Sequence, residues 1–171
     1  MIKQNKYVYH GSQRFHDKAF PVRNRRSRKQ KDGAVVTIFD QESFHATLYK
    51  WIAVAYTYTP AHYKIDGKIA NYNMGVDLYK HEKKLEIYGF ESLEKSLESL
   101  YGNGGYVTSF YANDFHHTGG LGNLEVITTT ELDAVEVEHI KNPLSILKKE
   151  GIKFEYIDLG KPENELLRNY E

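Results

Sequence analysis

The order of the short apolar runs constrains the fold of this chain more than any other feature of its sequence. Runs rich in β-branched and aromatic residues are typical of strands, and here they outnumber the runs with helical spacing without alternating regularly with them. A parallel α/β sheet requires that alternation, so the pattern predicts an α+β fold with mixed, mainly antiparallel sheets and a few flanking helices. The expected strands are 6–10, 34–39, 76–79, 84–90, 105–111, 124–129, 134–140 and 152–157.

Fewer segments have the spacing of apolar residues that is typical of helices. In the clearest of them the leucines share one face, and we expect Gly102 to follow it as a left-handed C-cap. Asn142 and Pro143 have the residue types that favour an N-cap and a first helical position. The expected helices are 48–58, 91–101 and 142–151.

The 171 residues are the usual size of one domain, and no repeat, low-complexity tract or linker divides them. We therefore expect a single domain spanning 1–171. The first twenty residues lack the apolar core of a signal peptide. The longest apolar run, 51–56, is far shorter than the roughly 20 residues of a membrane span. We expect a cytoplasmic protein with no membrane partner.

Several kinds of chemistry are excluded or disfavoured by the residues that the chain lacks. It has no cysteine, which excludes disulfides, thiol nucleophiles and thiolate-bound zinc or iron–sulfur clusters. Its eight histidines do not have the one-turn spacing of a helical metal site, so no metal is expected. The glycines at 102–105 follow a helix and precede a strand, which is the reverse of the phosphate-binding arrangement. The G-x-S-x-G motif of serine hydrolases is absent.

A basic stretch at 23–31 carries six cations and no acidic residue, although the whole chain balances 23 basic against 23 acidic residues. Because it contains no apolar residue, we expect an exposed loop or arm. Such a stretch is either a solvated loop or a contact for the phosphates of a nucleic acid or a nucleotide. The cations are Arg23, Arg25, Arg26, Arg28, Lys29 and Lys31.

Three segments in a fixed order carry a family resemblance. The sequence HGS at 10–12 ends the first expected strand, SFHAT at 43–47 leads into the first expected helix, and LEVI at 124–127 begins a late strand. In this order and spacing the chain resembles the ADP-ribosyltransferase fold of the diphtheria-toxin and poly(ADP-ribose) polymerase type. The resemblance covers most of the chain, and it implies that NAD is the substrate.

The resemblance implies a binding role for five residues. His10 would bind the adenosine or nicotinamide ribose of NAD, and the backbone of Gly11 would hold the nicotinamide amide. Ser12 would support the ribose. Phe44 would stack on the nicotinamide, with the helix that contains Tyr56 behind it.

The resemblance implies a catalytic role for Glu125, together with His10. The carboxylate of Glu125 would bind the 2′-hydroxyl of the nicotinamide ribose. Breaking the glycosidic bond develops positive charge on that ribose, and a fixed carboxylate stabilises the charge as it forms. Neither a metal nor a thiol is needed for this chemistry, which suits a chain without cysteine.

Two residues depart from the family pattern. Phe44 stands where the family often has a tyrosine, so the ring is kept and its hydroxyl is lost. Asn123 stands where toxins that modify arginine have a second acidic or amide residue, and its short side chain argues against arginine as the acceptor. The sequence leaves open an unidentified protein or nucleic-acid acceptor, an RNA 2′-phosphotransferase, or an inactive module that binds a nucleotide, nucleic acid or protein.

Overall fold

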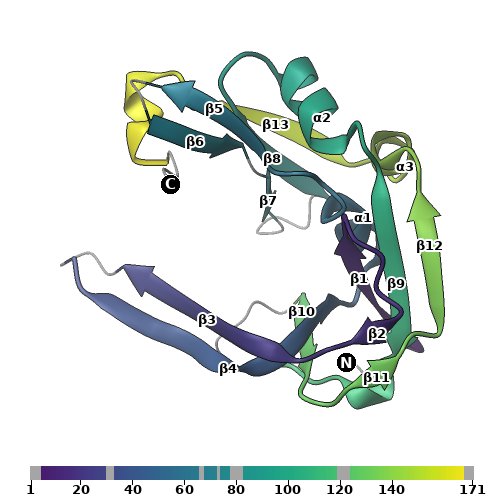
Figure 1. The fold of residues 1–171 in the computed structure, drawn as a ribbon. Coiled ribbons are helices and arrows are strands. Elements are labelled where there is room, and N and C mark those ends of the chain that lie inside the picture. The colour runs from purple at the N-terminus through teal and green to yellow at the C-terminus, as the bar shows by residue number, and fades with distance from the viewer. Residues whose placement is uncertain are drawn as a thin grey trace. The chain divides into compact units, whose positions relative to one another are not determined.

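The chain forms an α+β fold in which most strand pairs are antiparallel, as the strand pattern predicts, and the described residues include three α-helices beside the sheets (Figure 1). A computed structural model describes residues 5–29, 33–65, 68–72, 74–77, 83–118 and 124–167. The chain divides into two compact units, Met1–Tyr56 with Tyr106–His139 and Thr57–Gly105 with Ile140–Glu171. That they belong to one domain stays a prediction. In the described part of the chain, no helix has both the length and the apolar character that crossing a membrane requires.

The first unit is built on a sheet whose neighbouring strands are far apart in the sequence. The N-terminal strand lies between two others and is antiparallel to both (Figure 1). Its partner β4 is also antiparallel to β10 and to β3. The strand order is β10 (Glu125–Thr128), β4 (Val35–Thr47), β1 (Tyr7–Ser12), β9 (Gly105–Tyr111) and β12 (Glu136–Ile140), with β3 (Val22–Lys29) paired to β4.

Side chains alternate between the two faces of this sheet, and one face forms a hydrophobic core. Val8 of β1 packs there with residues of β4, β9 and β10, and the cluster includes Phe44, Phe110 and Val126. A pair of two-residue strands, β2 (Lys18–Ala19) and β11 (Leu132–Asp133), contributes Ala19 to the same cluster. Strands this short carry no periodicity, so the sequence pattern did not predict them.

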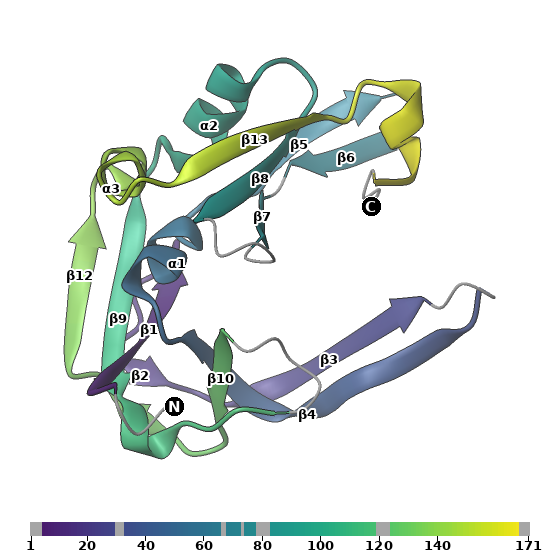
Figure 2. The same ribbon diagram turned by 180° about the vertical axis from the view of Figure 1, so that it is seen from behind.

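The first helix, α1, lies against β1 in the first unit (Figure 2). It spans Lys50–Ala55, and all its residues after the first are buried. The expected helix over 48–58 is thus correct in place but too long. Gly11 of β1 faces the helix so closely that a Cβ atom built there would lie 1.7 Å from the carbonyl oxygen of Ala53. Packing alone therefore requires glycine at position 11.

The second unit combines a small mixed sheet with two helices. Its central strand β8 is parallel to β13 and antiparallel to β7, and α2 lies against β8 and α3. A separate antiparallel hairpin, β5–β6, precedes the sheet in sequence. The elements are β5 (Ala61–Ile65), β6 (Lys68–Tyr72), β7 (Met74–Asp77), β8 (Lys84–Gly89), α2 (Leu93–Tyr101), α3 (Pro143–Lys149) and β13 (Lys153–Asp158).

The ends of these helices test the predicted caps. Asn142 caps α3 as predicted, because its side chain accepts a hydrogen bond from the backbone N–H of Ser145 at 3.0 Å. The predicted left-handed cap at Gly102 is wrong, since that residue has a right-handed φ of −62°. The chain instead makes one more turn, closed by a bond from the Gly104 N–H to the Tyr101 carbonyl. The positive φ therefore falls at Gly104.

Replacing Asn142 by alanine is expected to lower the free energy of unfolding by about 1 kcal/mol, because the Ser145 N–H loses its acceptor. Asn142→Asp keeps an acceptor and adds negative charge at the helix N-terminus, so it should stay within about 0.5 kcal/mol of the parent. Urea denaturation followed by circular dichroism measures both. An equal loss in the two variants would contradict the capping role.

Candidate functional site

The three segments that carry the family resemblance lie on three adjacent strands, β1, β4 and β10. Thr47 of β4 pairs with Tyr9 of β1 on one side and with Glu125 of β10 on the other. This row of three residues joins segments that are more than a hundred residues apart in the sequence. The fold therefore brings the strands of the predicted site together.

His10 lies where β1 and β4 separate. The two strands pair at a single position, Tyr9 opposite Thr47, and beyond it the imidazole of His10 reaches the backbone carbonyl of His45 at 2.8 Å from Nδ1. Because a carbonyl only accepts, Nδ1 carries the hydrogen and Nε2 is left as the acceptor nitrogen. Burial lowers the pKa of His10 to about 4, so the ring is neutral near pH 7.

Phe44 packs into the core of the first unit. Only 8% of the residue is exposed, and its ring lies 4.5 Å from that of His10 and 5.3 Å from that of Phe110. The ring predicted to stack on nicotinamide therefore packs at a tilt against the predicted site histidine. Position 44 follows the strand alternation, because Phe44 shares the core face with Ala46.

Glu125 is held by two side chains, one from the adjacent strand β4 and one from β3, which lies beyond it. Its Oε1 accepts hydrogen bonds from Nδ1 of His45 and Nη2 of Arg26, both at 2.6 Å, and its Oε2 accepts one from Nη1 of Arg26 at 2.8 Å. Burial by itself would raise the pKa of this carboxyl, but the bonds from His45 and Arg26 outweigh burial and hold the pKa below its ordinary value. A quarter of the side chain is exposed, so an ionised carboxylate remains accessible.

The structure divides the predicted site residues into two groups. His10 contacts Phe44, whereas Glu125 contacts His45 and Arg26. Phe44 and His45 are neighbours on one strand, so their side chains point to opposite faces. No contact joins His10 to Glu125 among the described residues, but residue 45 bonds to both, through its carbonyl to His10 and through its ring to Glu125.

The remaining predicted residues lie at the ends of their elements. The Oγ of Ser12, the last residue of β1, accepts a bond from the backbone N–H of Arg14 at 3.0 Å. Tyr56 follows the last residue of α1 and is 49% exposed. Asn123, on which the acceptor argument depended, lies outside the described residues.

Sequence reasoning missed His45 and Arg26 as partners of Glu125. The sequence could have indicated His45, because polar residues alternate along the end of β4 at Ser43, His45 and Thr47 and so share one face. Arg26 had none, since its position depends on how β3 pairs with β4. Ser43, His45 and Glu125 are connected in the order of a serine hydrolase triad, but Ser43 is completely buried and cannot reach a substrate.

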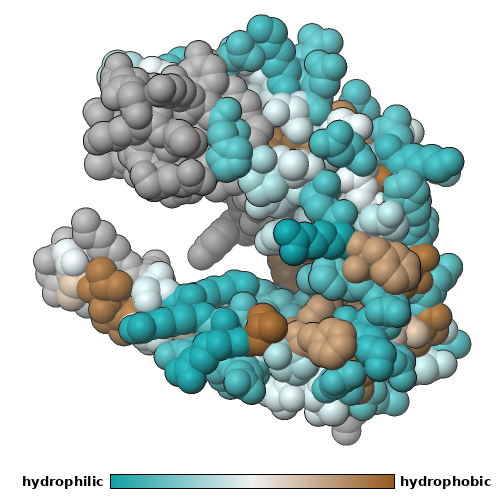
Figure 3. Space-filling view, viewed as in Figure 1, coloured by the Kyte–Doolittle hydropathy of each residue, from teal (hydrophilic) through white to brown (hydrophobic). Residues whose placement is uncertain are grey.

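The basic stretch is a strand, which corrects the expected loop or arm. Of residues 23–27, all are exposed except the half-buried Asn24, and the visible side chains of the strand are largely hydrophilic (Figure 3). As β3 it pairs with β4, whose acidic residues supply partners that the local sequence lacks: Arg23 forms an ion pair with Asp40 at 2.8 Å, and Arg25 lies opposite Asp40. With Arg26 bound to Glu125, pairing within the chain neutralises part of the charge. Lys31 lies outside the described residues.

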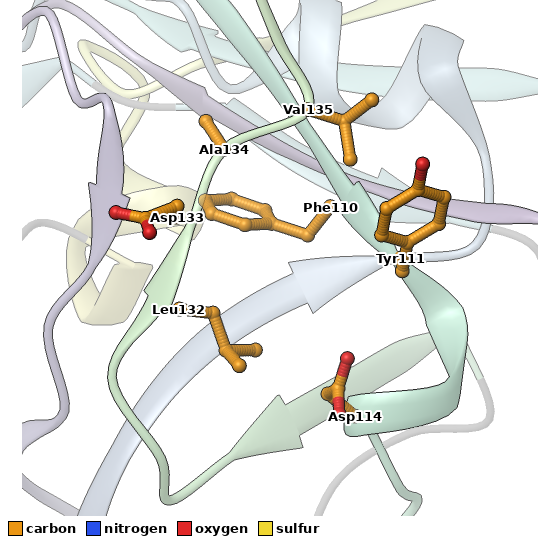
Figure 4. Close-up of a pocket in the computed structure, with 7 residues that line it drawn as sticks. All are labelled: Phe110, Tyr111, Asp114, Leu132, Asp133, Ala134 and Val135. Atoms are coloured by element: carbon orange, nitrogen blue, oxygen red, sulfur yellow. The ribbon is translucent and has the colours of Figure 1, made fainter.

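The first unit also has an open cavity of about 470 Å³ (Figure 4). Its wall is partly apolar, and the phenol of Tyr111 and the carboxyl of Asp114 are among the polar groups that line it. None of the site residues predicted from the sequence lines it. The lining residues are Phe110, Tyr111, Asp114, Leu132, Asp133, Ala134 and Val135.

The burial of His10 predicts a pH dependence of stability. Below its ordinary pKa of 6.5 the unfolded chain binds a proton at His10, whereas the folded protein does not until about pH 4. The contribution of His10 to the free energy of unfolding is therefore fully present above pH 6.5. It falls as the pH drops toward 4, by up to about 1.4 kcal/mol per pH unit.

Urea denaturation across this pH range measures the slope, and His10→Asn is the control. The asparagine amide can donate to the same His45 carbonyl but does not titrate, so the variant should lose this part of the slope. Identical slopes in the two proteins would show that His10 is not buried as a neutral ring.

Comparison with known proteins gives no match to a family model, to a curated sequence or to a solved structure.

Proposed function

We propose that the chain transfers ADP-ribose from NAD to an unidentified protein or nucleic acid, or hydrolyses NAD at the same bond. The observation that carries this proposal is the position of Glu125. It is an ionised, accessible carboxylate on β10. This strand pairs with β4, which in turn pairs with β1, and these two strands carry the other segments of the resemblance.

The hydrogen bonds of Glu125 leave room for a substrate hydroxyl. A carboxylate has about four acceptor positions, two on each oxygen. Here Oε1 uses both of its positions for His45 and Arg26, while Oε2 uses one for Arg26. The remaining position on Oε2 suits the 2′-hydroxyl of the nicotinamide ribose, which donates its hydrogen.

The reaction needs only a negative charge that is already held in place before the bond breaks. The bond between C1′ of the ribose and the nicotinamide nitrogen breaks, its electron pair leaves with nicotinamide, and positive charge develops on the ribose. Glu125 stabilises that charge. The new bond at C1′ forms to water or to the nucleophilic atom of the acceptor, which loses a proton to solvent.

His10 and the adjoining backbone supply binding groups of the right kind. The Nε2 atom of His10 accepts hydrogen bonds, as a ribose hydroxyl requires. Beyond Tyr9 the edge of β1 has no ladder partner in β4, and strand edges present N–H and C=O groups that match a carboxamide. Since packing against Ala53 already requires glycine at position 11, Gly11 itself adds no support.

The test is nicotinamide release from NAD by the purified protein, followed by chromatography. Parallel reactions contain buffer alone, cell lysate, mixed nucleic acid, or RNA with a splice-junction 2′-phosphate. Release in buffer indicates hydrolysis, and release only with lysate or nucleic acid indicates transfer. Release only with the phosphorylated RNA would point instead to a 2′-phosphotransferase. No release in any reaction would overturn the proposal.

A second candidate is a module that binds a nucleotide without turnover. The burial of Phe44 favours it, because a ring packed in the core against His10 and Phe110 is not available to stack on nicotinamide. Isothermal titration calorimetry with NAD separates the two candidates. Binding without nicotinamide release supports the module, and binding with release supports the enzyme.

A further inference from the structure

We infer that His45 is a positioning residue for Glu125 and that a half-buried chain of hydrogen bonds, Asn24–Ser43–His45, fixes the ring hydrogen of His45 on the nitrogen that faces the carboxylate. The catalytic meaning of this inference rests on the proposed function. The chain of bonds itself does not, and it can be tested without NAD.

The chain of bonds crosses three strands. On β3, Nδ2 of Asn24 lies 2.8 Å from the backbone carbonyl of Ser43 and 3.3 Å from its Oγ. On β4, that Oγ lies 2.9 Å from Nε2 of His45. The opposite ring nitrogen, Nδ1, lies 2.6 Å from Oε1 of Glu125 on β10.

The chemistry of each group sets the direction of every bond. The Ser43 carbonyl can only accept, so the atom of Asn24 beside it is the NH₂ group. One of its two hydrogens goes to the Val22 carbonyl at 2.9 Å, and the other is shared between the Ser43 carbonyl at 2.8 Å and the Ser43 Oγ at 3.3 Å. The Ser43 hydroxyl then donates to Nε2 of His45. Nδ1 therefore carries the hydrogen and donates to Glu125, which as a carboxylate only accepts.

The opposite direction would leave a buried group without a partner. If Nε2 carried a hydrogen, the Ser43 oxygen would accept from both Asn24 and His45, and its own hydrogen would need another acceptor. Ser43 is completely buried, so water cannot supply one. A buried donor without a partner costs about 1–3 kcal/mol, which selects the direction described.

His45 positions Glu125 and does not exchange protons with a substrate. Both of its ring nitrogens are occupied, and only 18% of its side chain is exposed. The ring also forms a T-shaped contact with the ring of Phe39, with centroids 5.4 Å apart. Arg26, the other partner of Glu125, is 48% exposed, so His45 is the more firmly anchored of the two.

The consequence for catalysis is a carboxylate with a fixed orientation. With Oε1 held by His45, the unused acceptor position of Oε2 keeps one direction. Without His45 the carboxylate would keep only the exposed Arg26 and could rotate with it. Misplacement of a reacting group by about 1 Å can cost 100-fold in rate.

The first experiment is ¹⁵N NMR of the histidine side chains at neutral pH. The wild-type His45 signal should show hydrogen on Nδ1 and none on Nε2. Ser43→Ala removes the donor to Nε2, and the His45 signal should shift toward a mixture of the two forms. Wild-type His45 with hydrogen on Nε2, or an unchanged signal in Ser43→Ala, would overturn the inference.

The second experiment compares two substitutions by nicotinamide release. His45→Phe keeps a ring beside Phe39 but has no donor for Glu125, and its kcat should fall about tenfold or more with little change in the KM for NAD. His45→Asn places an amide donor near the Nδ1 position and should recover most of the rate. Circular dichroism melting checks that both variants are folded.

The outcomes separate this inference from the proposed function. If wild-type protein releases nicotinamide and His45→Phe does so at the same rate, the positioning role is wrong while the function stands. If the wild type is inactive, the function fails, and the NMR experiment still decides whether the chain of bonds exists.

Discussion

Replacing Glu125 by glutamine is expected to lower the rate of nicotinamide release from NAD at least about 100-fold, the scale of one lost electrostatic contact in a transition state. The amide has almost the same shape as the carboxylate and keeps an oxygen that accepts hydrogen bonds. It lacks the negative charge that stabilises the positive charge developing on the ribose. The loss should therefore appear in kcat, while the KM for NAD changes little.

The matched control for this change is Glu131→Gln. Glu131 belongs to the same unit and pairs with Lys18 at 3.4 Å, so the control removes an ion-paired carboxylate away from the proposed chemistry. It should keep the parental rate. Equal activity of Glu125→Gln and the wild type would show that Glu125 is not the catalytic carboxylate, and equal losses in the two variants would indicate a general effect of removing charge.

Replacing Gly11 by alanine is expected to lower the free energy of unfolding by more than about 3 kcal/mol, the upper end of the usual cost of overpacking. The added methyl carbon would lie 1.7 Å from the carbonyl oxygen of Ala53. A side chain could rotate away, but this oxygen belongs to the backbone of α1. Either α1 or β1 must therefore shift.

Urea denaturation measures the loss, with Gly160→Ala as the control. A Cβ at position 160 would first meet the carboxylate end of the flexible Asp158 side chain, at 3.0 Å, so the control should cost much less. Because α1 follows β4 directly, Gly11→Ala should also weaken whatever NAD binding the wild type has. Equal stability of the two variants would contradict the close packing of α1 on β1.

The parts of the fold that could be predicted are those in which local residue types agree with the final packing. β9 occupies 105–111 as predicted, because its apolar and β-branched residues are buried along almost its whole length. The Asn142 cap was predictable because the side chain that accepts the hydrogen bond and the Ser145 N–H that donates it lie within one helical turn. Both features depend on residues that are neighbours in the sequence.

The parts that could not be predicted depend on pairing between distant strands. β3 has no strand periodicity of its own, and it is a strand because β4 pairs with it and supplies Asp40 for its cations. The same pairing brings Arg26 to Glu125, 99 residues away in the sequence. The sequence also could not predict which face of the sheet carries the side chain of Phe44, since a single phenylalanine is equally consistent with a core position and with a ligand contact.

The double contact of residue 45 has a consequence for how this protein can change through mutation. His10 is held by the main-chain oxygen of residue 45, which every amino acid provides, whereas Glu125 is held by the imidazole, which only histidine provides. A substitution of residue 45 by a side chain without a donor therefore removes a hydrogen bond from the carboxylate of Glu125 and leaves the backbone acceptor of His10 in place. If Glu125 has the proposed role, drift at this one position changes the proposed reaction while the half-buried imidazole of His10 keeps its hydrogen bond.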